Sequence, residues 1–437
     1  MKRHLLQENP VRHRRWLRII PVALVMYTIS YIDRTNISLA LPSMSRGLHM
    51  NAVQAGSAAG IFFWGYLLFQ IPGGHLASRG SPKRLVSILL ILWGACAVGT
   101  GLVQTWRELW LMRLLLGAAE SGVFPATLIL LANWFPRSER ARANAYWMLC
   151  QPVALILSSP LSGYILGRWN WRVLLVSEGV LPFLWLVIWE VFIDDRPAKA
   201  AWISRQERES LEATLRRERL QTVNEPHVSF RKTLLQPQVL LMIGVYFLLN
   251  CGSYGYLFWL PSALASVRKL PSFSIGVLFS IPYVLAGFAM VFNSRHSDKS
   301  RERRLHVAVP LILSGVLLFG AVFESRHSTL LSFALISLAA AGPFATLGPF
   351  WAIPTETLPK EVAGAAMGMI NALGSFGGFF GPFAVGIVKQ RTHNFVDAFF
   401  LLSTALAASG IIAVFLRKEK RAAWDLPAAP LEETTSG

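Results

Sequence analysis

Four ionisable residues lie in stretches of the sequence that are otherwise apolar. Asp33 and Arg34 are adjacent in the first apolar stretch, and Arg113 and Glu120 stand seven residues apart in the fourth. Each would cost about 2.5–3.5 kcal/mol if it faced lipid at the centre of a membrane-spanning helix. Seven residues make close to two helical turns, so Arg113 and Glu120 share one helix face. We expect the four side chains to form one cluster that faces an aqueous cavity.

Such a cluster can bind both an anion and a proton. Arginine forms charge-assisted, bidentate hydrogen bonds with a carboxylate, which makes Arg34 and Arg113 candidates for binding an acidic substrate. Apolar surroundings favour the neutral form of a carboxylic acid, so Asp33 and Glu120 are candidates for taking up and releasing a proton. The alternative is a pair of salt bridges that only fix one helix against another. Buried ion pairs stabilise less well than apolar packing does, which favours the functional interpretation.

Polar side chains in other apolar stretches could complete the cavity. Each alone is more typical of a hydrogen bond between helices, but together they come from six different stretches. Glu178 and Glu356 lie nearer the ends of their stretches, where an interfacial ion pair is expected, and we leave both out of the site. The candidates for lining the cavity are Tyr31, Tyr66, Gln151, Asn250, Tyr254 and Asn371.

The composition places these residues in a membrane protein. Of 437 residues, 53% are hydrophobic and 15% are charged, and the apolar runs repeatedly reach the roughly 20 residues that cross a bilayer. A soluble fold is therefore excluded. The formal charge of +18 does not indicate nucleic-acid binding, because the basic residues sit in short loops instead of on one face. The predicted spans are 17–43, 53–77, 83–104, 107–133, 141–167, 172–192, 237–261, 273–294, 304–323, 328–353, 363–389 and 395–416.

The spans form two sets of six. An N-terminal bundle (1–192) and a C-terminal bundle with a short tail (237–437) are separated by a charged linker with amphipathic helical character (193–236). The halves repeat each other faintly, since the charged loop 79–84 has a counterpart at 298–304. The sequence thus predicts an all-α polytopic membrane protein, with two six-helix bundles facing each other around a central site.

The basic residues also predict the orientation of the chain. Of the 42 lysines and arginines, 31 fall in the tails and loops of one side and 9 on the other. Because cytoplasmic loops carry the excess of positive charge, both termini are predicted to be cytoplasmic.

The sequence contains no catalytic motif that would indicate an enzyme. Cys96, Cys150 and Cys251 lie in separate apolar stretches without a CxxC spacing or a nearby histidine, so neither a disulfide nor a metal site is predicted. Nucleophile elbows and phosphate-binding loops are absent from the sequence as well. We therefore expect no enzymatic activity and no cofactor.

Several motifs resemble the anion:cation symporter family of the major facilitator superfamily, in particular its bacterial permeases for tartrate, phthalate and hydroxyphenylacetate. The resemblance covers nearly the whole chain, and the Asp-Arg pair combined with Arg-x6-Glu is its most specific part. The motifs that carry it are Tyr31-Ile-Asp-Arg-Thr-Asn-Ile37, residues 113–125, Trp134-Phe-Pro136 with Glu139-Arg-Ala-Arg142, and residues 371–382.

The resemblance implies roles for individual residues. Arg34 would hold the carboxylate of the substrate, Asp33 and Glu120 would be the protonatable pair, and Arg113 would modulate Glu120. The positions that match the cavity of similar sugar-acid symporters are Tyr31, Tyr66, Gln151 and, on the opposite bundle, Asn371.

Charged loop residues are candidates for gating. These are Arg79 between the second and third spans, and Asp298 and Arg304 between the eighth and ninth. The superfamily usually carries an acidic residue before the arginine of the first loop, whereas this chain has Ser78. The charge relay of that loop is therefore expected to be weakened.

The predicted function is proton-coupled uptake of a small organic anion by alternating access, in a bacterial inner membrane and by a monomer. Tartrate, phthalate, hydroxyphenylacetate or a sugar acid would be the substrate, and the partners would be that anion, protons and the lipid bilayer. Three alternatives stay open. An organic-anion exchanger would not need Glu120, a multidrug exporter would favour acids without arginines, and a nutrient sensor would carry a long signalling tail.

Overall fold

The computed structural model describes residues 10–223, 233–267, 270–325, 327–358 and 360–417. The described part of the chain is helical and contains no strand. It holds twelve helical spans that are long and apolar enough to cross a membrane. Their ends lie within six residues of the predicted ends, so the predicted fold is confirmed. Most of the predicted C-terminal tail, 418–437, lies outside the described residues.

The first six spans form the N-terminal bundle, in which all spans but the third consist of two consecutive helices. The spans are α1 (Pro10–Thr35) with α2 (Ile37–Gly47), α3 (Ala52–Gly60) with α4 (Phe62–Arg79), α5 (Pro82–Leu102), α6 (Trp106–Glu120) with α7 (Val123–Trp134), α8 (Arg137–Met148) with α9 (Cys150–Arg168), and α10 (Trp171–Gly179) with α11 (Leu181–Phe192).

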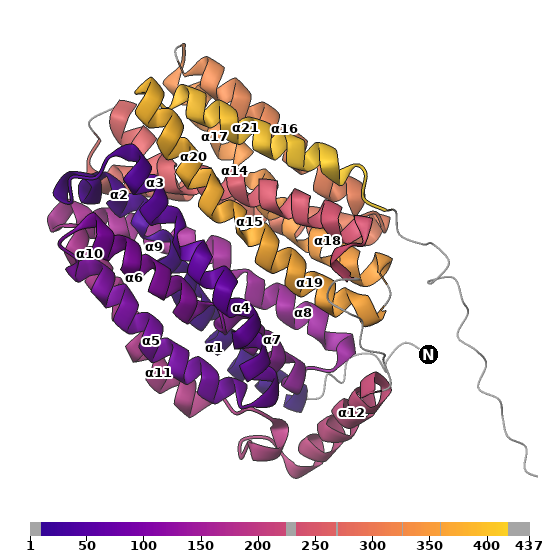
Figure 1. Cartoon of the computed structure of the whole chain (residues 1–437). Coiled ribbons are helices and arrows are strands. Elements are labelled where there is room, and N and C mark those ends of the chain that lie inside the picture. The colour runs from indigo at the N-terminus through magenta and orange to yellow at the C-terminus, as the bar shows by residue number, and fades with distance from the viewer. Residues whose placement is uncertain (1–9, 224–232, 268–269, 326, 359, 418–437) are drawn as a thin grey trace, which may run out of the picture.

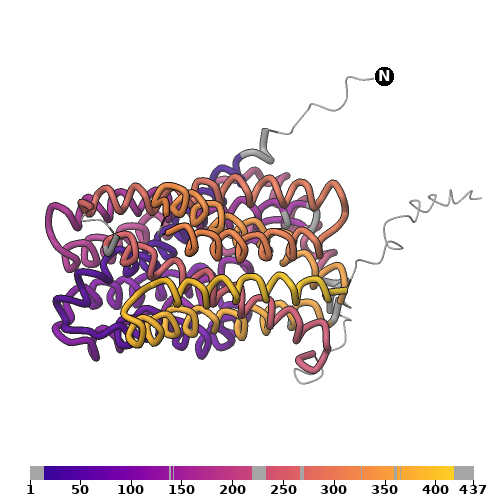
Figure 2. The backbone as a smooth tube through the Cα atoms, turned by 90° about the horizontal axis from the view of Figure 1, so that it is seen from above, coloured from indigo at the N-terminus to yellow at the C-terminus, as the bar shows by residue number. Residues whose placement is uncertain are grey.

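The other six spans form the C-terminal bundle, which lies beside the first (Figure 1). In a view at right angles the helices again run alongside one another (Figure 2). The spans are α14 (Pro237–Val267), α15 (Ser272–Ser300), α16 (Arg304–Glu324), α17 (Thr329–Ala339) with α18 (Ala341–Thr357), α19 (Lys360–Ser375) with α20 (Gly377–Thr392), and α21 (Val396–Ala413).

Prolines account for four of the breaks within spans. Each stands in the first turn of the second helix of its span. An N–H group in the first turn has no hydrogen-bond partner within its own helix, so a proline costs that helix no hydrogen bond. It does leave a carbonyl group of the preceding helix without its donor. Such a break is tolerated in a membrane only where neighbouring helices supply partners for the freed groups. The four residues are Pro125, Pro152, Pro182 and Pro343.

The outer surface of the bundles is apolar. Large side chains such as Leu68, Phe288 and Phe292 are more than half exposed, although they belong to spans. Exposure of this kind is stable when the surrounding solvent is lipid. The surface therefore fits a protein embedded in a bilayer on all sides.

The linker between the bundles is partly helical. It contains the short helix η1 (Pro197–Lys199) and α12 (Arg205–Val223), which lies at the end of the molecule where α1 begins and α21 ends (Figure 1). We call this end the terminal face, and the end that carries the loops 47–52 and 168–171 the opposite face. Arg140 of α8 and Glu218 of α12 form an ion pair of 3.4 Å, so the linker helix is attached to the N-terminal bundle.

Small residues bring the two bundles into contact toward the opposite face. A Cβ atom added to Gly56 of α3 would lie 2.4 Å from the carbonyl oxygen of Pro382 in α20. Gly163 of α9 and Gly276 of α15 approach each other in the same way, with 3.1 Å between an added Cβ and the opposing Cα. In contrast, Gly364 and Gly368 of α19, nearer the terminal face, have open space around them. The bundles are thus closed against each other toward the opposite face.

Candidate binding site between the two bundles

The helix of the first span is interrupted directly after Asp33 and Arg34. Helix α1 ends at Thr35 and α2 begins at Ile37, so Asp33 and Arg34 stand in the last turn of α1. The guanidinium of Arg113 donates to the carbonyl oxygen of Asp33 at 3.1 Å and to that of Arg34 at 3.0 Å. Carbonyl groups at the end of a helix need such donors when no water is present. Arg113 therefore binds the backbone that carries the charged pair.

Arg34 forms an ion pair with Glu120. Its Nη2 lies 3.2 Å from Oε2 of Glu120, and Ser30 donates to the same oxygen at 2.8 Å. Both partners are nearly inaccessible, with exposures of 6% for Arg34 and 1% for Glu120. Oε1 of Glu120 and Nε of Arg34 have no hydrogen-bond partner among the described residues. The pair thus keeps hydrogen-bonding capacity that a ligand could use.

Asp33 points away from this pair. Its Oδ2 accepts a hydrogen bond of 2.6 Å from Nε1 of Trp93 in α5, and its Oδ1 has no partner in the described part of the chain. Adjacent residues of a helix project about 100° apart, which separates Asp33 from Arg34. The single cluster expected from the sequence is therefore divided: Arg34 pairs with Glu120, while the carboxylate of Asp33 and the guanidinium of Arg113 lie behind them.

Aromatic rings surround the charge of Arg34. The centre of its guanidinium lies 5.0 Å from the rings of Phe62 and Tyr66 and 5.6 Å from that of Tyr31. A cation over the face of such rings is stabilised by their quadrupoles, and more strongly where water is excluded. The rings therefore help to hold an arginine in an otherwise apolar interior.

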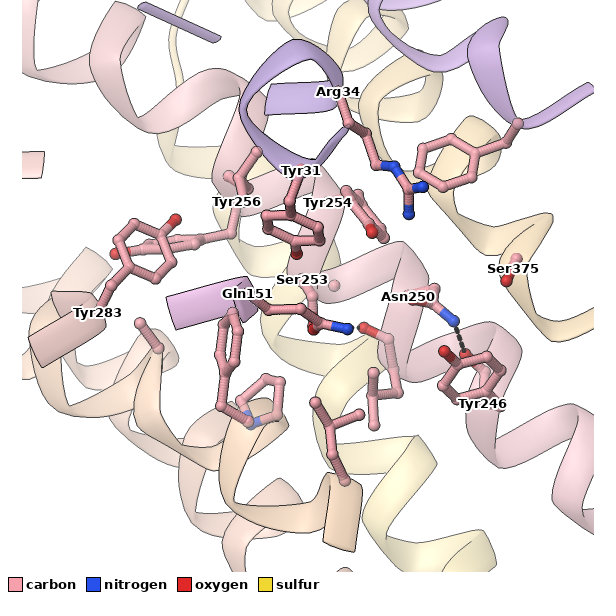
Figure 3. A pocket seen from close by; sticks show the side chains of 18 of the residues that line it. Tyr31, Arg34, Gln151, Tyr246, Asn250, Ser253, Tyr254, Tyr256, Tyr283 and Ser375 are labelled. Carbon is pink, nitrogen blue, oxygen red and sulfur yellow. Dashed lines mark hydrogen bonds between the residues drawn. The ribbon is translucent and has the colours of Figure 1, made fainter. Parts of the chain in front are cut away.

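A cavity of about 1000 Å³, including its open mouth, lies between the bundles. Among the described residues that line it, Arg34 is the one charged side chain. Figure 3 shows Tyr31, Tyr254 and Gln151 directed toward the same space as Arg34. Arg113, Asp33 and Glu120 are not part of the lining. The cavity contains seven of the eight predicted substrate-binding residues: Tyr31, Arg34, Tyr66, Gln151, Asn250, Tyr254 and Asn371.

Asn250 is held in position by the C-terminal bundle. Its amide nitrogen donates to the carbonyl oxygen of Tyr246 at 2.8 Å and to that of Gly374 at 3.2 Å, which connects α14 to α19 (Figure 3). The ring of Tyr246 in turn stacks on Phe350 at 5.3 Å. This side of the cavity is therefore built from neutral polar groups on packed helices.

Tyrosines dominate the lining to an extent that the sequence analysis missed. The chain has nine tyrosines, of which seven line the cavity. The hydroxyl groups of Tyr256 and Tyr283 are buried without a partner among the described residues. The sequence does contain a signal for this lining, because nearly all of the tyrosines lie in apolar stretches. The four that were not predicted are Tyr27, Tyr246, Tyr256 and Tyr283.

The predicted gating residues lie near the terminal face. Asp298 pairs with Arg303 at 2.5 Å, and Arg303 also pairs with Glu356 at 3.0 Å, which matches the ion pair expected for Glu356. Burial opposes the charge of Arg303, but hydrogen bonds to Glu356 and Asp298 outweigh it and raise the pKa of the guanidinium. Arg304, the residue named from the sequence, donates instead to the carbonyl oxygen of Val414. Arg79 is exposed at the end of α4.

Glu178 does not form the ion pair expected from the sequence. It is 4% exposed, and its Oε1 accepts a hydrogen bond of 2.7 Å from Ser162. No lysine, arginine or histidine of the described residues pairs with it. The expectation was wrong because α10 turns this side chain inward toward α9 instead of toward the membrane interface.

Comparisons with known proteins agree with this architecture. The chain is 31% identical to a protein of Agrobacterium vitis named "Putative tartrate transporter", over 94% of this chain and 95% of that protein. It is 27% identical to the quinolone resistance transporter of Acinetobacter baumannii, over 91% and 93%. The inward open structure of the xylose transporter XylE from E. coli has the same fold, with a TM-score of 0.74, 15% identity and coverage of 93% and 97%.

The family model of the Major Facilitator Superfamily matches residues 23–382, which include Arg34 and Glu120 and extend from the first span of the N-terminal bundle into α20 of the C-terminal bundle. The two six-helix bundles, the cavity between them and this match lead to one conclusion. The chain is a multi-pass membrane transporter that belongs to the Major Facilitator Superfamily.

Proposed function

We propose that this protein carries a small organic anion into the cell together with a proton, by alternating access of one central cavity. The observation that carries the proposal is the placement of Arg34, the one charged side chain among the described lining residues, in an ion pair with Glu120 just behind it. A substrate carboxylate and the carboxylate of Glu120 compete for the same guanidinium. Binding of one therefore depends on the charge of the other.

The coupling follows from this competition. When Glu120 is ionised, it engages Arg34 and weakens the binding of a second anion. When Glu120 takes up a proton, its attraction for Arg34 falls, and the guanidinium is free to form charge-assisted hydrogen bonds with a substrate carboxylate. The proton on Glu120 and the one carboxylate bound to Arg34 then add no net charge to the apolar interior around this pair. Release of the proton on the other side reverses both steps.

The lining favours a hydroxylated acid as the substrate. One carboxylate would bind to Arg34, while hydroxyl and amide groups such as those of Tyr256, Tyr283 and Gln151 offer neutral hydrogen bonds to the rest of the molecule. Buried donors without partners bind a substrate selectively when it supplies the missing acceptors. The similarity to a protein named for tartrate transport supports tartrate or a sugar acid.

The orientation and the conformational state complete the proposal. With both termini in the cytoplasm, the contacts through Gly56 and Gly163 close the periplasmic side of the cavity. The described conformation would then be the one from which substrate leaves toward the cytoplasm. All lining residues come from one chain, so a monomer is sufficient for transport.

Uptake of labelled tartrate into proteoliposomes with an inward proton gradient tests the function. We expect Arg34→Ala to lose uptake by about tenfold or more, since a hydrogen bond to a charged group contributes about 1.5–3 kcal/mol. Glu120→Gln should abolish the response to the gradient. Arg107→Ala is the control, because Arg107 is exposed at the start of α6. Normal transport by both the Arg34 and the Glu120 variants would refute the proposal.

Drug export is a second candidate, favoured by the similarity to the quinolone resistance transporter and by aromatic lining residues such as Phe63 and Trp351. The two functions differ in their dependence on Arg34. An exporter of drugs should lower the accumulation of a fluoroquinolone in cells and should keep that activity in Arg34→Ala. Protection from the drug without any uptake of organic acids would favour this candidate.

A further inference from the structure

Glu178 is a buried acid to which the proposed function gives no role. Ser162 of α9 donates to its Oε1 at 2.7 Å, and its Oε2 has no hydrogen-bond partner among the described residues. A buried carboxylate without a cation costs several kcal/mol in its ionised form. A protein that only needed to hold α9 against α10 could use two neutral groups at lower cost. We therefore expect the acidic group at this position to have a function beyond holding the two helices together.

The surroundings of Glu178 lead to Asp33. Helix α10 packs against α1, α2, α5, α9 and α11. Ser162 and Asn36 are the neutral neighbours of Glu178, and Asp33, the one acid of α1, stands three residues before Asn36. Arg172 of α10 itself donates to the carbonyl oxygen of Val103 and to Gln104, and so is engaged elsewhere.

Glu178 lies between the opposite face and Asp33. It stands seven residues from Trp171, where α10 begins, which places it about 10 Å from that face. Asp33 stands fourteen residues from Gly47, where α2 ends, and so about 20 Å from the same face. Gly47 and Trp171 are in contact, so the two depths share one origin. Asn36 lies beside Glu178 and one helical turn from Asp33.

Three of the four buried acids described in the N-terminal bundle share one arrangement, while the fourth, Glu139, pairs with Arg15. In each of the three, one carboxylate oxygen accepts a hydrogen bond from a side chain, and the other has no partner among the described residues. The bonded oxygens accept from Ser162, Trp93 and Ser30. A carboxyl group with one fixed oxygen and one open oxygen can bind a proton on the open oxygen without losing its existing bond. The open oxygens belong to Glu178, Asp33 and Glu120.

We propose that Glu178 is a further proton-binding residue, which passes protons between the opposite face and Asp33 by a route separate from the substrate cavity. The proposal rests on the proposed function. A proton from water binds to Oε2 of Glu178. Because the depths of the two acids differ by about 10 Å, the proton does not pass between them directly. The O–H bond at Oε2 of Glu178 breaks as a water molecule takes up the proton, and water then delivers it to Oδ1 of Asp33, which leaves Glu178 as a carboxylate that Ser162 still holds.

The separate route has a consequence for transport. Neither Glu178 nor Asp33 lines the cavity. A proton can therefore reach Asp33 from the opposite face while the contacts through Gly56 and Gly163 keep the anion out.

Glu178→Gln and Ser162→Ala distinguish a proton carrier from a structural hydrogen bond. The glutamine variant keeps the shape and the bond to Ser162 but cannot bind and release a proton. The alanine variant removes the bond and keeps the acid. For Glu178→Gln we expect proton-driven tartrate uptake to fall by about a hundredfold, the lower range for loss of a proton-transferring group. Gradient-free exchange of tartrate should change by less than about twofold, since it moves no net proton. Ser162→Ala should keep proton-driven uptake within about the same twofold range.

The possible outcomes separate the two proposals. Proton-driven uptake in the wild type that is unchanged in Glu178→Gln, or an equal loss of uptake and exchange in both variants, overturns the role of Glu178 alone. If uptake by the wild type does not depend on the proton gradient, both the proposed function and the role of Glu178 are wrong. If Glu178→Gln does not assemble, Glu178→Asp takes its place. This variant keeps the acid, and its uptake must retain a dependence on pH for the proposal to stand.

Discussion

Several hydrogen-bonding groups at or near the candidate site have no partner within the described residues. Oε1 of Glu120, Oδ1 of Asp33 and the hydroxyl groups of Tyr256 and Tyr283 are buried and unbonded within the described residues. In most protein interiors such groups are rare, because each costs about 1–3 kcal/mol. In the proposed transport cycle, a ligand or a proton supplies the missing bonds at these four groups.

Removing an unbonded hydroxyl should weaken binding without lowering stability. We expect Tyr283→Phe to bind tartrate about threefold to tenfold less tightly, as fits a lost hydrogen bond of about 0.5–1.5 kcal/mol. Its melting temperature without substrate should be no lower than that of the wild type, because no bond within the protein is lost and a buried group without a partner is removed. Thermal-shift titration of the purified protein measures both quantities. A lower melting temperature with unchanged affinity would mean that the hydroxyl has a partner in the protein instead.

Arg113 is expected to act through the backbone of the first span. In Arg113→Gln, the carbonyl oxygens of Asp33 and Arg34 lose a charged donor, which costs about 1.5–3 kcal/mol for a hydrogen bond to a charged group. Melting temperature and transport should therefore fall together. Arg107→Gln, an exposed position on the same helix, is the control. Full stability of Arg113→Gln would argue against this role.

Individual helices carry two kinds of special positions. Prolines such as Pro343 divide spans, so that a helix can change direction next to the site. Glycines such as Gly56 and Gly163 allow helices of different bundles to come close, because an added side chain would collide with backbone atoms. The first kind shapes the cavity and the second closes one side of it. Both kinds of residue act through atoms that they lack, which are the backbone N–H hydrogen in proline and the side chain in glycine.

Enlarging a contact glycine should open the closed side of the cavity. In Gly56→Ala the new Cβ would lie 2.4 Å from the carbonyl oxygen of Pro382, so the closed arrangement is disfavoured. With Cys96, Cys150 and Cys251 replaced, a cysteine at Ser253 in the cavity should react faster with a membrane-impermeant thiol reagent added to the opposite face. Gly368→Ala, where the added atom meets open space, should leave the rate unchanged. Equal rates in both variants would show that this contact does not close the cavity.

The molecule as a whole is asymmetric in charge. The lysines and arginines gather at the terminal face, and the linker helix α12 lies at the same end (Figure 1). In a bilayer this difference sets the orientation at insertion. The direction of transport relative to the cell depends on it, since the described conformation is closed only toward the opposite face.

Reporter fusions test the orientation. A fluorescent protein fused after Arg417 should be bright and alkaline phosphatase fused there inactive, because both termini are expected in the cytoplasm. Fusions after Gln104, in the loop between the third and fourth spans, should give the reverse. Fluorescence and phosphatase activity in intact cells provide the readout. Active phosphatase at Arg417 would invert the proposed direction of transport.

The sequence by itself determined the twelve spans, the two bundles and the transporter family, because apolar runs of bilayer length have few alternative structures. It also identified the charged residues of the first and fourth spans. Only the tertiary structure decided that Arg34 faces the cavity while Asp33, its neighbour, faces Trp93. The tertiary structure was also needed to show that Glu178 points inward and that seven tyrosines line one cavity. The physical reason is that lipid and protein interior are similarly apolar, so hydrophobicity does not reveal which face of a membrane helix meets another helix.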